Sequence, residues 1–128
     1  MILDSSAVLA ILFREAGFET LFERLAADSN PGIGSPTLAE TGIVLVARLG
    51  NSSRGRLTSF LAQSDVAIVP FGETHWRSAV DAFHRFGKGR HPAGLNFGDC
   101  MSYATAKLAD QPLLCAGADF AKTDLRLA

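Results

Sequence analysis

Four acidic residues in separate parts of the chain are the strongest candidates for chemistry: Asp4, Glu40, Asp99 and Asp119. Carboxylates that cluster repel one another and take up protons near neutral pH unless a cation neutralises them. No histidine or cysteine stands at metal-ligand spacing with them, and an all-oxygen set suits a hard divalent ion, Mg²⁺ or Mn²⁺. Such an ion supplies a hydroxide-like nucleophile and offsets charge on phosphate oxygens, so the set predicts metal-assisted hydrolysis of a phosphodiester.

Three of these acids also have a purely structural explanation. Asp4 could be an Asx-type turn residue, and Asp119 could cap a last helical turn. Asp99 would occupy the third position of a helix capped by Asn96, where an acid commonly satisfies free backbone amides. Each of these acids alone is therefore weak evidence, and the hypothesis depends on their convergence.

A purely structural role explains Glu40 less well than it explains the other three acids. Its neighbours three and four positions later are Ile43 and Val44, which predicts that its carboxylate shares the apolar face of a helix. This pattern favours a functional carboxylate over a partly buried glutamate bound to a backbone or arginine partner.

The elements that must position these acids alternate between strands and helices. Apolar runs predict strands at residues 1–3, 66–70 and 113–115, with a further candidate at 125–127. Helices are predicted at residues 7–14, 18–27, 35–49 with Ser35 as N-cap, 53–63, 73–86 and 96–109 with Asn96 as N-cap. The alternation predicts an α/β domain with a mainly parallel sheet. The run at 66–70 is typical of a strand covered on both faces.

Two of the acids follow predicted strands directly. Asp4 comes after the first strand, and Asp119 lies a few residues after the strand at 113–115. Because ligands in open α/β sheets bind at the carboxyl ends of the strands, both carboxylates are expected at that edge.

Composition excludes several classes of protein. The 128 residues are 48% hydrophobic and 20% charged, which predicts one compact domain over residues 1–128 rather than a disordered chain. The N-terminus lacks a basic leader, and the apolar run at 7–13 is shorter than the about 20 residues of a bilayer span. We therefore expect a cytoplasmic protein with no membrane association. Cys100 and Cys115 lack CxxC spacing, which favours buried thiols over a disulfide or zinc site.

The near-neutral balance of 12 basic against 13 acidic residues hides a local excess of positive charge. Residues 75–91 carry four lysines or arginines against one aspartate, a net of +3. One divalent cation bound to the acids would also change the formal net charge from -1 to +1. The candidates for contacts with an RNA phosphate backbone are Arg85, Lys88, Arg90 and His91, against the alternative of an ordinary solvated loop.

Four segments together resemble the PIN-domain ribonucleases, and within them the VapC-type toxins of toxin–antitoxin modules. They read ILDSS at residues 2–6, SPTLAET at 35–41, GKGRHPAGLNFGDC at 87–100, and LLCAGADF at 113–120 followed by Thr123 and Asp124. The resemblance covers essentially the whole chain. It implies a three-layer fold whose parallel sheet has the order 3-2-1-4-5, flanked by helices. It also implies a homodimer whose site is blocked by a VapB-type antitoxin.

The resemblance also implies a role for each site residue. Asp4, Glu40 and Asp99 match the three core acids of an Mg²⁺- or Mn²⁺-dependent endoribonuclease, with Asp4 and Asp99 as direct metal ligands. Asp119 matches the fourth acid, although Asp124 lies close enough to compete for that role. Ser6 matches a small hydroxyl residue that orients a ligand or a metal-bound water.

Two alternatives remain open from the residues. A HAD-like phosphatase also begins with a strand and an aspartate, but its motif has a second acid two residues later, where this chain has Ser6. A non-catalytic binding module would use the acids for folding only. Such a module would dock a partner helix on the stripe of Phe18, Leu21, Phe22 and Leu25, although stripes of this kind more often belong to the core.

Overall fold

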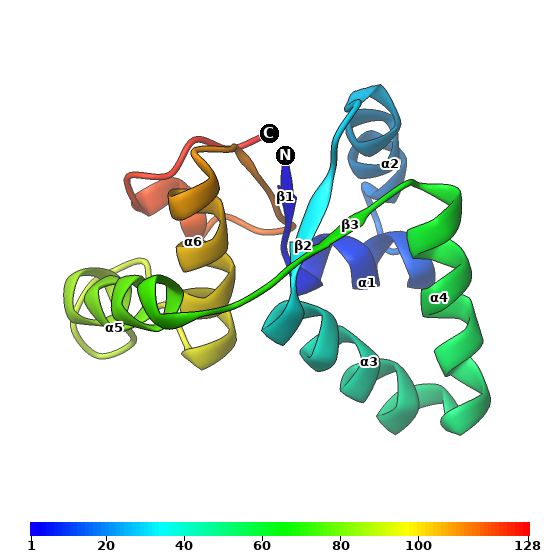
Figure 1. The fold of residues 1–128 in the computed structure, drawn as a ribbon, viewed down its shortest axis with the longest axis horizontal. Coiled ribbons are helices and arrows are strands. Elements are labelled where there is room, and N and C mark those ends of the chain that lie inside the picture. Colours follow the sequence, from blue (N-terminus) through cyan, green and yellow to red (C-terminus); the bar gives the residue numbers. More distant parts are fainter.

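A parallel β-sheet lies between two layers of helices in the computed structural model, which describes all residues 1–128 (Figure 1). Its strands are β1 (Ile2–Leu3), β2 (Gly32–Gly34), β3 (Ala67–Val69) and β4 (Leu113–Leu114). Its helices are α1 (Ser5–Phe13), α2 (Phe18–Ala27), α3 (Ser35–Leu49), α4 (Arg54–Gln63), α5 (Glu73–Phe86) and α6 (Phe97–Ala109). Two short 3-10 turns, η1 (Asn51–Ser53) and η2 (Phe120–Lys122), complete the fold.

The sheet has the order β3-β2-β1-β4, and every pair of neighbouring strands is parallel. The predicted parallel α/β architecture is therefore confirmed, with four strands rather than five. The strand predicted at 125–127 is reduced to one isolated bridge between Leu127 and Leu113, beside β4 where a fifth strand would lie. The turn η2 and the bends after it end just before this segment, which is then joined to Leu113 by only two backbone hydrogen bonds, from the Leu113 amide to the Arg126 carbonyl and from the Ala128 amide to the Leu113 carbonyl.

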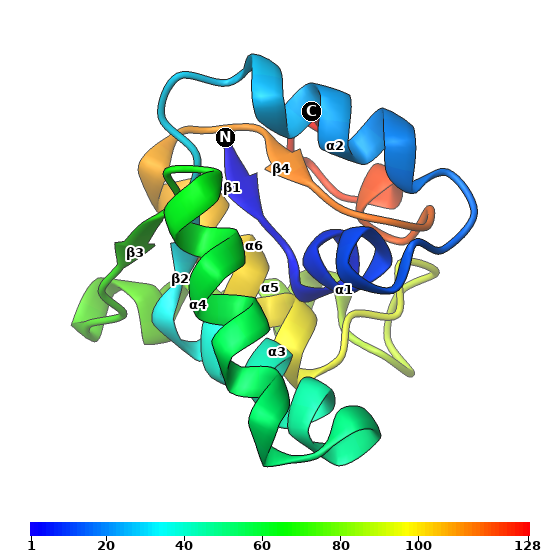
Figure 2. The ribbon, with the colours of Figure 1, turned by 90° about the vertical axis from the view of Figure 1, so that its right-hand side faces the viewer.

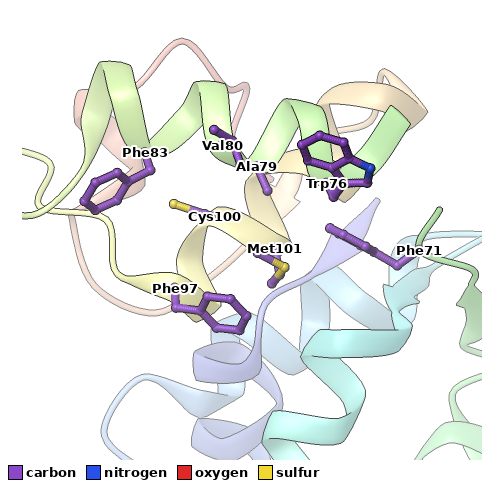
Figure 3. A pocket seen from close by; sticks show the side chains of 8 residues that line it. All are labelled: Phe71, Trp76, Ala79, Val80, Phe83, Phe97, Cys100 and Met101. Carbon is purple, nitrogen blue, oxygen red and sulfur yellow. The ribbon is translucent and has the colours of Figure 1, made fainter. Parts of the chain in front are cut away.

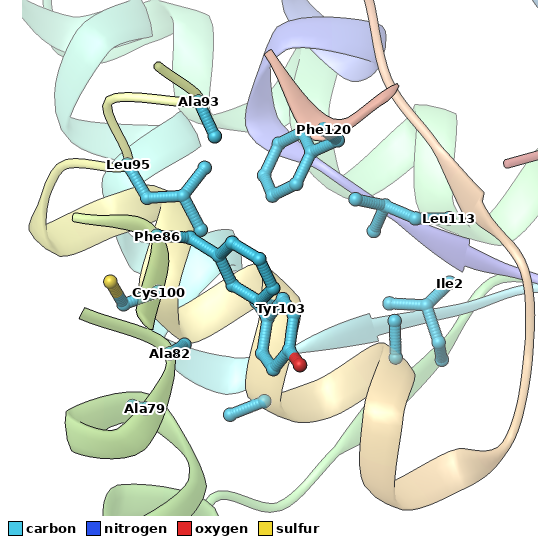
Figure 4. Close-up of a cluster of buried hydrophobic side chains, with 12 residues drawn as sticks. Ile2, Ala79, Ala82, Phe86, Ala93, Leu95, Cys100, Tyr103, Leu113 and Phe120 are labelled. Atoms are coloured by element: carbon cyan, nitrogen blue, oxygen red, sulfur yellow. The ribbon is translucent and has the colours of Figure 1, made fainter. Parts of the chain in front are cut away.

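Alternation along the two central strands divides the core into two clusters. Ile2 and Leu113 face α5 and α6, where they join Phe86, Tyr103 and Phe120 (Figure 4). Leu3 and Leu114 face the opposite layer, which is formed by the helices α1 to α4 (Figure 2). Because successive side chains of a strand point to opposite faces, two-residue strands suffice to anchor both layers.

The strand β3 differs from its prediction, because it ends the sheet instead of lying inside it. Val66, just before the strand, is buried, whereas Ile68 is 54% exposed. A continuous apolar run does not distinguish a central strand from an edge strand with one open face. The prediction that both faces of this strand are covered is therefore wrong.

The helix starts largely follow the sequence signals. Asn96 caps α6 as predicted, and Asp4 caps α1 by accepting a hydrogen bond from the Ser6 amide at 3.0 Å. The N-cap of α3 is Gly34 rather than Ser35, which is already helical. A Cβ atom at Gly34 would lie 2.5 Å from the Thr105 hydroxyl, so β2 passes too close to α6 for a larger residue.

No helix combines the length and the apolar character that crossing a membrane requires. Cys100 is a buried free thiol, as the sequence predicted, whereas Cys115 is a free thiol that is only half-buried.

Candidate active site

Asp4 is held at the carboxyl end of β1, with 3% of its surface exposed. Its Oδ2 atom accepts hydrogen bonds from the amide and the hydroxyl of Ser6. Its Oδ1 atom accepts a hydrogen bond from Ser102 Oγ at 2.6 Å. A buried charge is unfavourable unless it is hydrogen-bonded, and three donors meet that requirement here.

Ser6, the predicted supporting hydroxyl, links Asp4 to the chain beyond β4. Its Oγ atom accepts a hydrogen bond from the Ala116 amide at 3.0 Å while donating to Asp4. The carboxyl ends of β1 and β4, which are neighbours in the sheet, are thereby joined through one side chain.

Glu40 reaches the same region from α3, although the face that its sequence neighbours suggested is only partly buried. The buried residues of α3 are Thr37, Thr41 and Leu45, whereas Ile43 is 69% exposed. The predicted apolar face is therefore wrong at Ile43, whereas Val44 is half-buried, as Glu40 is. A Cβ atom at Gly98 would lie 2.5 Å from Glu40 Oε2, so the carboxylate packs directly against the start of α6.

The pKa of Glu40 is raised, first by burial and then by the negative charges of Asp4 and Asp99, against a hydrogen bond from Ser5 that lowers it. The pKa of Asp99 is also raised, by burial and by the charges of Asp4 and Asp119, against the lowering effect of the Asn96 amide. The four predicted acids therefore interact electrostatically, as expected of carboxylates gathered at one edge.

Asp99 takes the capping role that its sequence position indicated. Asn96 Oδ1 accepts from the Asp99 amide at 2.9 Å, and Asp99 Oδ2 accepts from the Asn96 amide at 2.9 Å. This capping box occupies one carboxylate oxygen. The other oxygen, Oδ1, is left for an external ligand.

Asp119 and Asp124 lie in different surroundings. Asp119 precedes η2, is exposed, and acts on the pKa of Asp99. Asp124 instead accepts from Tyr103 at 2.6 Å, from Lys107 Nζ at 2.9 Å and from Arg85 at 3.3 Å. The structure thus places Asp119, and not Asp124, beside the other acids.

The basic residues predicted to contact RNA are mostly engaged within the protein. Arg85 pairs with Asp124 and lies over the Phe86 ring, with its guanidinium carbon 4.7 Å from the ring centroid. Arg90 donates to the His84 carbonyl at 3.2 Å, and His91 Nδ1 accepts from the Ala93 amide at 3.1 Å. Lys88 is exposed.

Sequence reasoning missed several residues of this site: Ser5, Thr37, Gly98, Ser102 and Cys115. Burial and then the charges of Asp4, Asp99 and Asp119 raise the pKa of the Cys115 thiol to about 11. Ser102 follows Asp99 by three positions, a spacing that places both on one helix face and could have identified it. No local sequence signal indicates that the Glu40 carboxylate packs against Gly98.

The donor set fits a hard divalent cation. It consists of carboxylate oxygens, and neighbouring negative charges contribute to the raised pKa of Glu40 and of Asp99, so a cation placed among them would relieve this repulsion. No three of the carboxylates converge closely enough to form a complete coordination sphere by themselves. Mg²⁺ accommodates this arrangement, because it is usually held by one or two carboxylates and keeps several waters.

Comparisons with known proteins agree on the fold and on the family. The sequence model of the PIN-domain family matches residues 1–125 of this chain. Ribonuclease VapC36 of Mycobacterium tuberculosis is 45% identical over 126 residues, which are 98% of this chain and 91% of that protein.

Solved structures with lower sequence identity share the same fold. Mycobacterium tuberculosis VapC20, described as a Sarcin-Ricin loop cleaving toxin, superposes with a TM-score of 0.78 at 17% identity, covering 99% of this chain and 97% of that one. VapBC2 from Rickettsia felis, solved bound to a DNA fragment from its promoter, superposes with a TM-score of 0.75 at 18% identity. The match covers 99% of this chain and 96% of that one. With an acid cluster at the carboxyl edge of a parallel sheet and a family match over nearly every residue, the chain belongs to the PIN-domain family.

Proposed function

We propose that this protein is an Mg²⁺- or Mn²⁺-dependent endoribonuclease, the toxin of a type II toxin–antitoxin pair. The observation that carries the proposal is the approach of Glu40 and Asp99 to buried Asp4, whose negative charge contributes to the raised pKa of both. The similarity to ribonuclease VapC36 supports RNA as the substrate class.

Each acid has a distinct part in the proposed reaction. Asp4 and Asp99 would hold the cation, and Asp119 adds negative charge at the exposed side of the site. When bound, the cation supplies stabilisation of negative charge developing on the phosphate oxygens. The raised pKa of Glu40 suits it to accept a proton from the attacking water, because general bases act best with a pKa near the working pH.

Among the four basic residues predicted to contact the RNA backbone, Lys88 would make the main contact. This residue is exposed, whereas the Arg85 guanidinium is paired with Asp124 and Arg90 donates to a backbone carbonyl. His91 is half-buried against Phe86, with ring centroids 5.1 Å apart, and would shape the loop.

Carboxylate substitutions together with metal removal test the proposed reaction. The wild-type protein is expected to cleave structured RNAs with Mn²⁺ and to stop when EDTA is added. Asp4→Asn and Asp99→Asn should each reduce the cleavage rate about 100-fold or more, the scale of a lost electrostatic contact to a transition state. Asp65→Asn is the matched control, because Asp65 is exposed and follows α4, away from the acid cluster. Cleavage that survives EDTA, or full activity in both site variants, would contradict the proposal.

We further propose that a VapB-type antitoxin neutralises the protein. The full-length similarity to a VapC protein supports this partner, and a VapB–VapC assembly is among the structures that share the fold. Co-expression with its VapB-type partner should suppress RNA cleavage, and unchanged cleavage in the purified complex would contradict this part of the proposal.

We also propose that the chain forms a homodimer through an apolar groove between α5 and α6 (Figure 3). The groove has a volume of 550 Å³ and is lined only by apolar side chains. Val80 is 61% exposed and Phe97 is 78% exposed, although both are large apolar residues. Contiguous apolar surface of this kind typically marks a protein interface. The lining residues are Phe71, Trp76, Ala79, Val80, Phe83, Phe97, Cys100 and Met101.

A further inference from the structure

Two buried hydroxyl groups connect Asp4 to both of the helices that carry the other core acids. Ser102, on α6, has no exposed surface, and its Oγ atom lies 2.6 Å from Asp4 Oδ1 and 3.1 Å from Thr37 Oγ1. Thr37, on α3, is 1% exposed. The three groups form a chain that runs from α3 through α6 to the end of β1.

Each hydroxyl group has only one proton to donate, and this fixes the direction of the hydrogen bonds between Thr37, Ser102 and Asp4. Ser102 donates its only hydroxyl proton to Asp4. Its bond with Thr37 must therefore be one in which Thr37 donates and Ser102 accepts. A chain of donors that ends on a carboxylate polarises each member, which strengthens the bond at its end.

The same chain determines which lone pair of Asp4 remains open. Each carboxylate oxygen has about two acceptor sites. Oδ2 receives both the amide and the hydroxyl of Ser6, whereas Oδ1 receives Ser102 alone. One acceptor site on Oδ1 therefore stays free.

We propose that Ser102 and Thr37 are positioning residues that hold Asp4 so that its free Oδ1 site faces the divalent cation. This inference rests on the metal dependence proposed above. Ser102 lies three residues after Asp99 on α6, and Thr37 lies three residues before Glu40 on α3. Because residues three apart share a helix face, the helices that present Asp99 and Glu40 also fix Asp4 through these hydroxyls. The orientation of all three acids is thereby coupled.

Titration calorimetry of the intact protein with Mn²⁺ alone measures metal binding and tests whether these hydroxyl groups position Asp4. Ser102→Ala is expected to weaken Mn²⁺ binding about 10- to 100-fold, as losses of an orienting partner typically do. Thr37→Val should weaken binding in the same direction but by less, because Ser102 keeps its own proton. Thr37→Ser, which retains the hydroxyl, should bind Mn²⁺ with wild-type affinity.

Thr41→Val separates positioning from general destabilisation. Thr41 is fully buried on the same helix, and its hydroxyl donates to the Thr37 carbonyl at 2.8 Å rather than to a carboxylate. Its Mn²⁺ affinity should equal that of the wild type, even if thermal melting without metal shows a loss of stability like that of Ser102→Ala.

The outcomes distinguish the inference from the function on which it rests. Wild-type affinity in Ser102→Ala and Thr37→Val, with binding lost in Asp4→Asn, would overturn the inference and leave the metal site intact. Equal weakening in Thr41→Val would also overturn it. Failure of the wild-type protein to bind Mn²⁺ would instead contradict the proposed function. If Ser102→Ala does not fold, the comparison of Thr37→Val with Thr37→Ser decides.

Discussion

The contact between Glu40 and Gly98 shows how one missing side chain can shape this site. The backbone at Gly98 leaves space that the Glu40 carboxylate fills, and any Cβ atom there would collide with it. Gly98 lies in the first turn of α6, next to Asp99. The Glu40 carboxylate can therefore keep this position beside α6 only because Gly98 has no side chain.

Gly98→Ala tests this contact. The added methyl group would displace the Glu40 carboxylate, and misplacement of a catalytic group by about 1 Å can reduce a rate about 100-fold. We expect RNA cleavage to fall by about 10- to 100-fold while the protein remains folded by circular dichroism.

Gly55→Ala on α4 is the matched control, because a Cβ atom there would meet nothing within 4 Å. It should leave cleavage unchanged and raise the free energy of unfolding by about 0.5–1 kcal/mol. Wild-type cleavage by Gly98→Ala would show that the position of Glu40 does not matter.

At the scale of elements, Asp124 holds the C-terminal segment against α5 and α6. It accepts from Tyr103 and Lys107 on α6 and from Arg85 on α5. Burial opposes its ionisation, but the hydrogen bonds from Tyr103 and Lys107 and the charge of Arg85 outweigh it and lower the pKa of Asp124 to about 2. The segment fixed in this way also carries Asp119.

Asp124→Asn should destabilise the protein in a pH-dependent way. An unfolded aspartate has a pKa of about 3.9, so the ionised contact stabilises the folded state above that pH. The contribution disappears as the pH falls through the folded pKa of about 2. Allowing for screening of a side chain that is 35% exposed, we expect a loss of about 1 kcal/mol at pH 7 in urea denaturation.

The difference between wild type and Asp124→Asn should shrink as the pH is lowered from about 4 to 2. Asp110→Asn is the control, since Asp110 pairs with Arg126 at 3.0 Å but is 97% exposed. It should change stability little at any pH. A difference for Asp124→Asn that persists undiminished in acid would show that the contact is not ionic.

At the scale of the whole molecule, the apolar surface is unevenly distributed. The stripe on α2 that suggested a docking site is divided, because Leu25 is buried whereas Phe22 is 48% exposed. The groove between α5 and α6 is apolar throughout and reaches Phe97, two residues before Asp99. A second copy bound there would lie next to the acid site.

Val80→Asp tests the proposed dimer. A charge at this exposed position should be tolerated in a monomer but would be desolvated in an interface, so we expect the dimer to dissociate. Size-exclusion chromatography with light scattering would measure the mass. Leu108→Asp is the matched control, because Leu108 is a 46% exposed residue of α6 outside the groove. A monomeric wild type, or an unchanged dimer in Val80→Asp, would contradict the proposed interface.

The sequence by itself determined the six helices, the parallel sheet and the Asn96 cap of α6, but it missed the central strand β2, whose three residues include two glycines. Caps and amphipathic periods depend on residues within about four positions of one another, so they can be recognised locally. Asp4 lies directly after β1 for the same local reason, whereas Asp119 follows β4 only after several loop residues.

Only the tertiary structure decided which side chains meet. Ser102 and Asp4 are separated by 98 positions in the sequence, and Thr37 and Ser102 by 65. The edge position of β3, the packing of Glu40 on Gly98 and the capture of Asp124 by Tyr103 likewise depend on how distant elements pack. These contacts have no local signal, because they arise from packing between segments whose separation in the chain sets no distance in space.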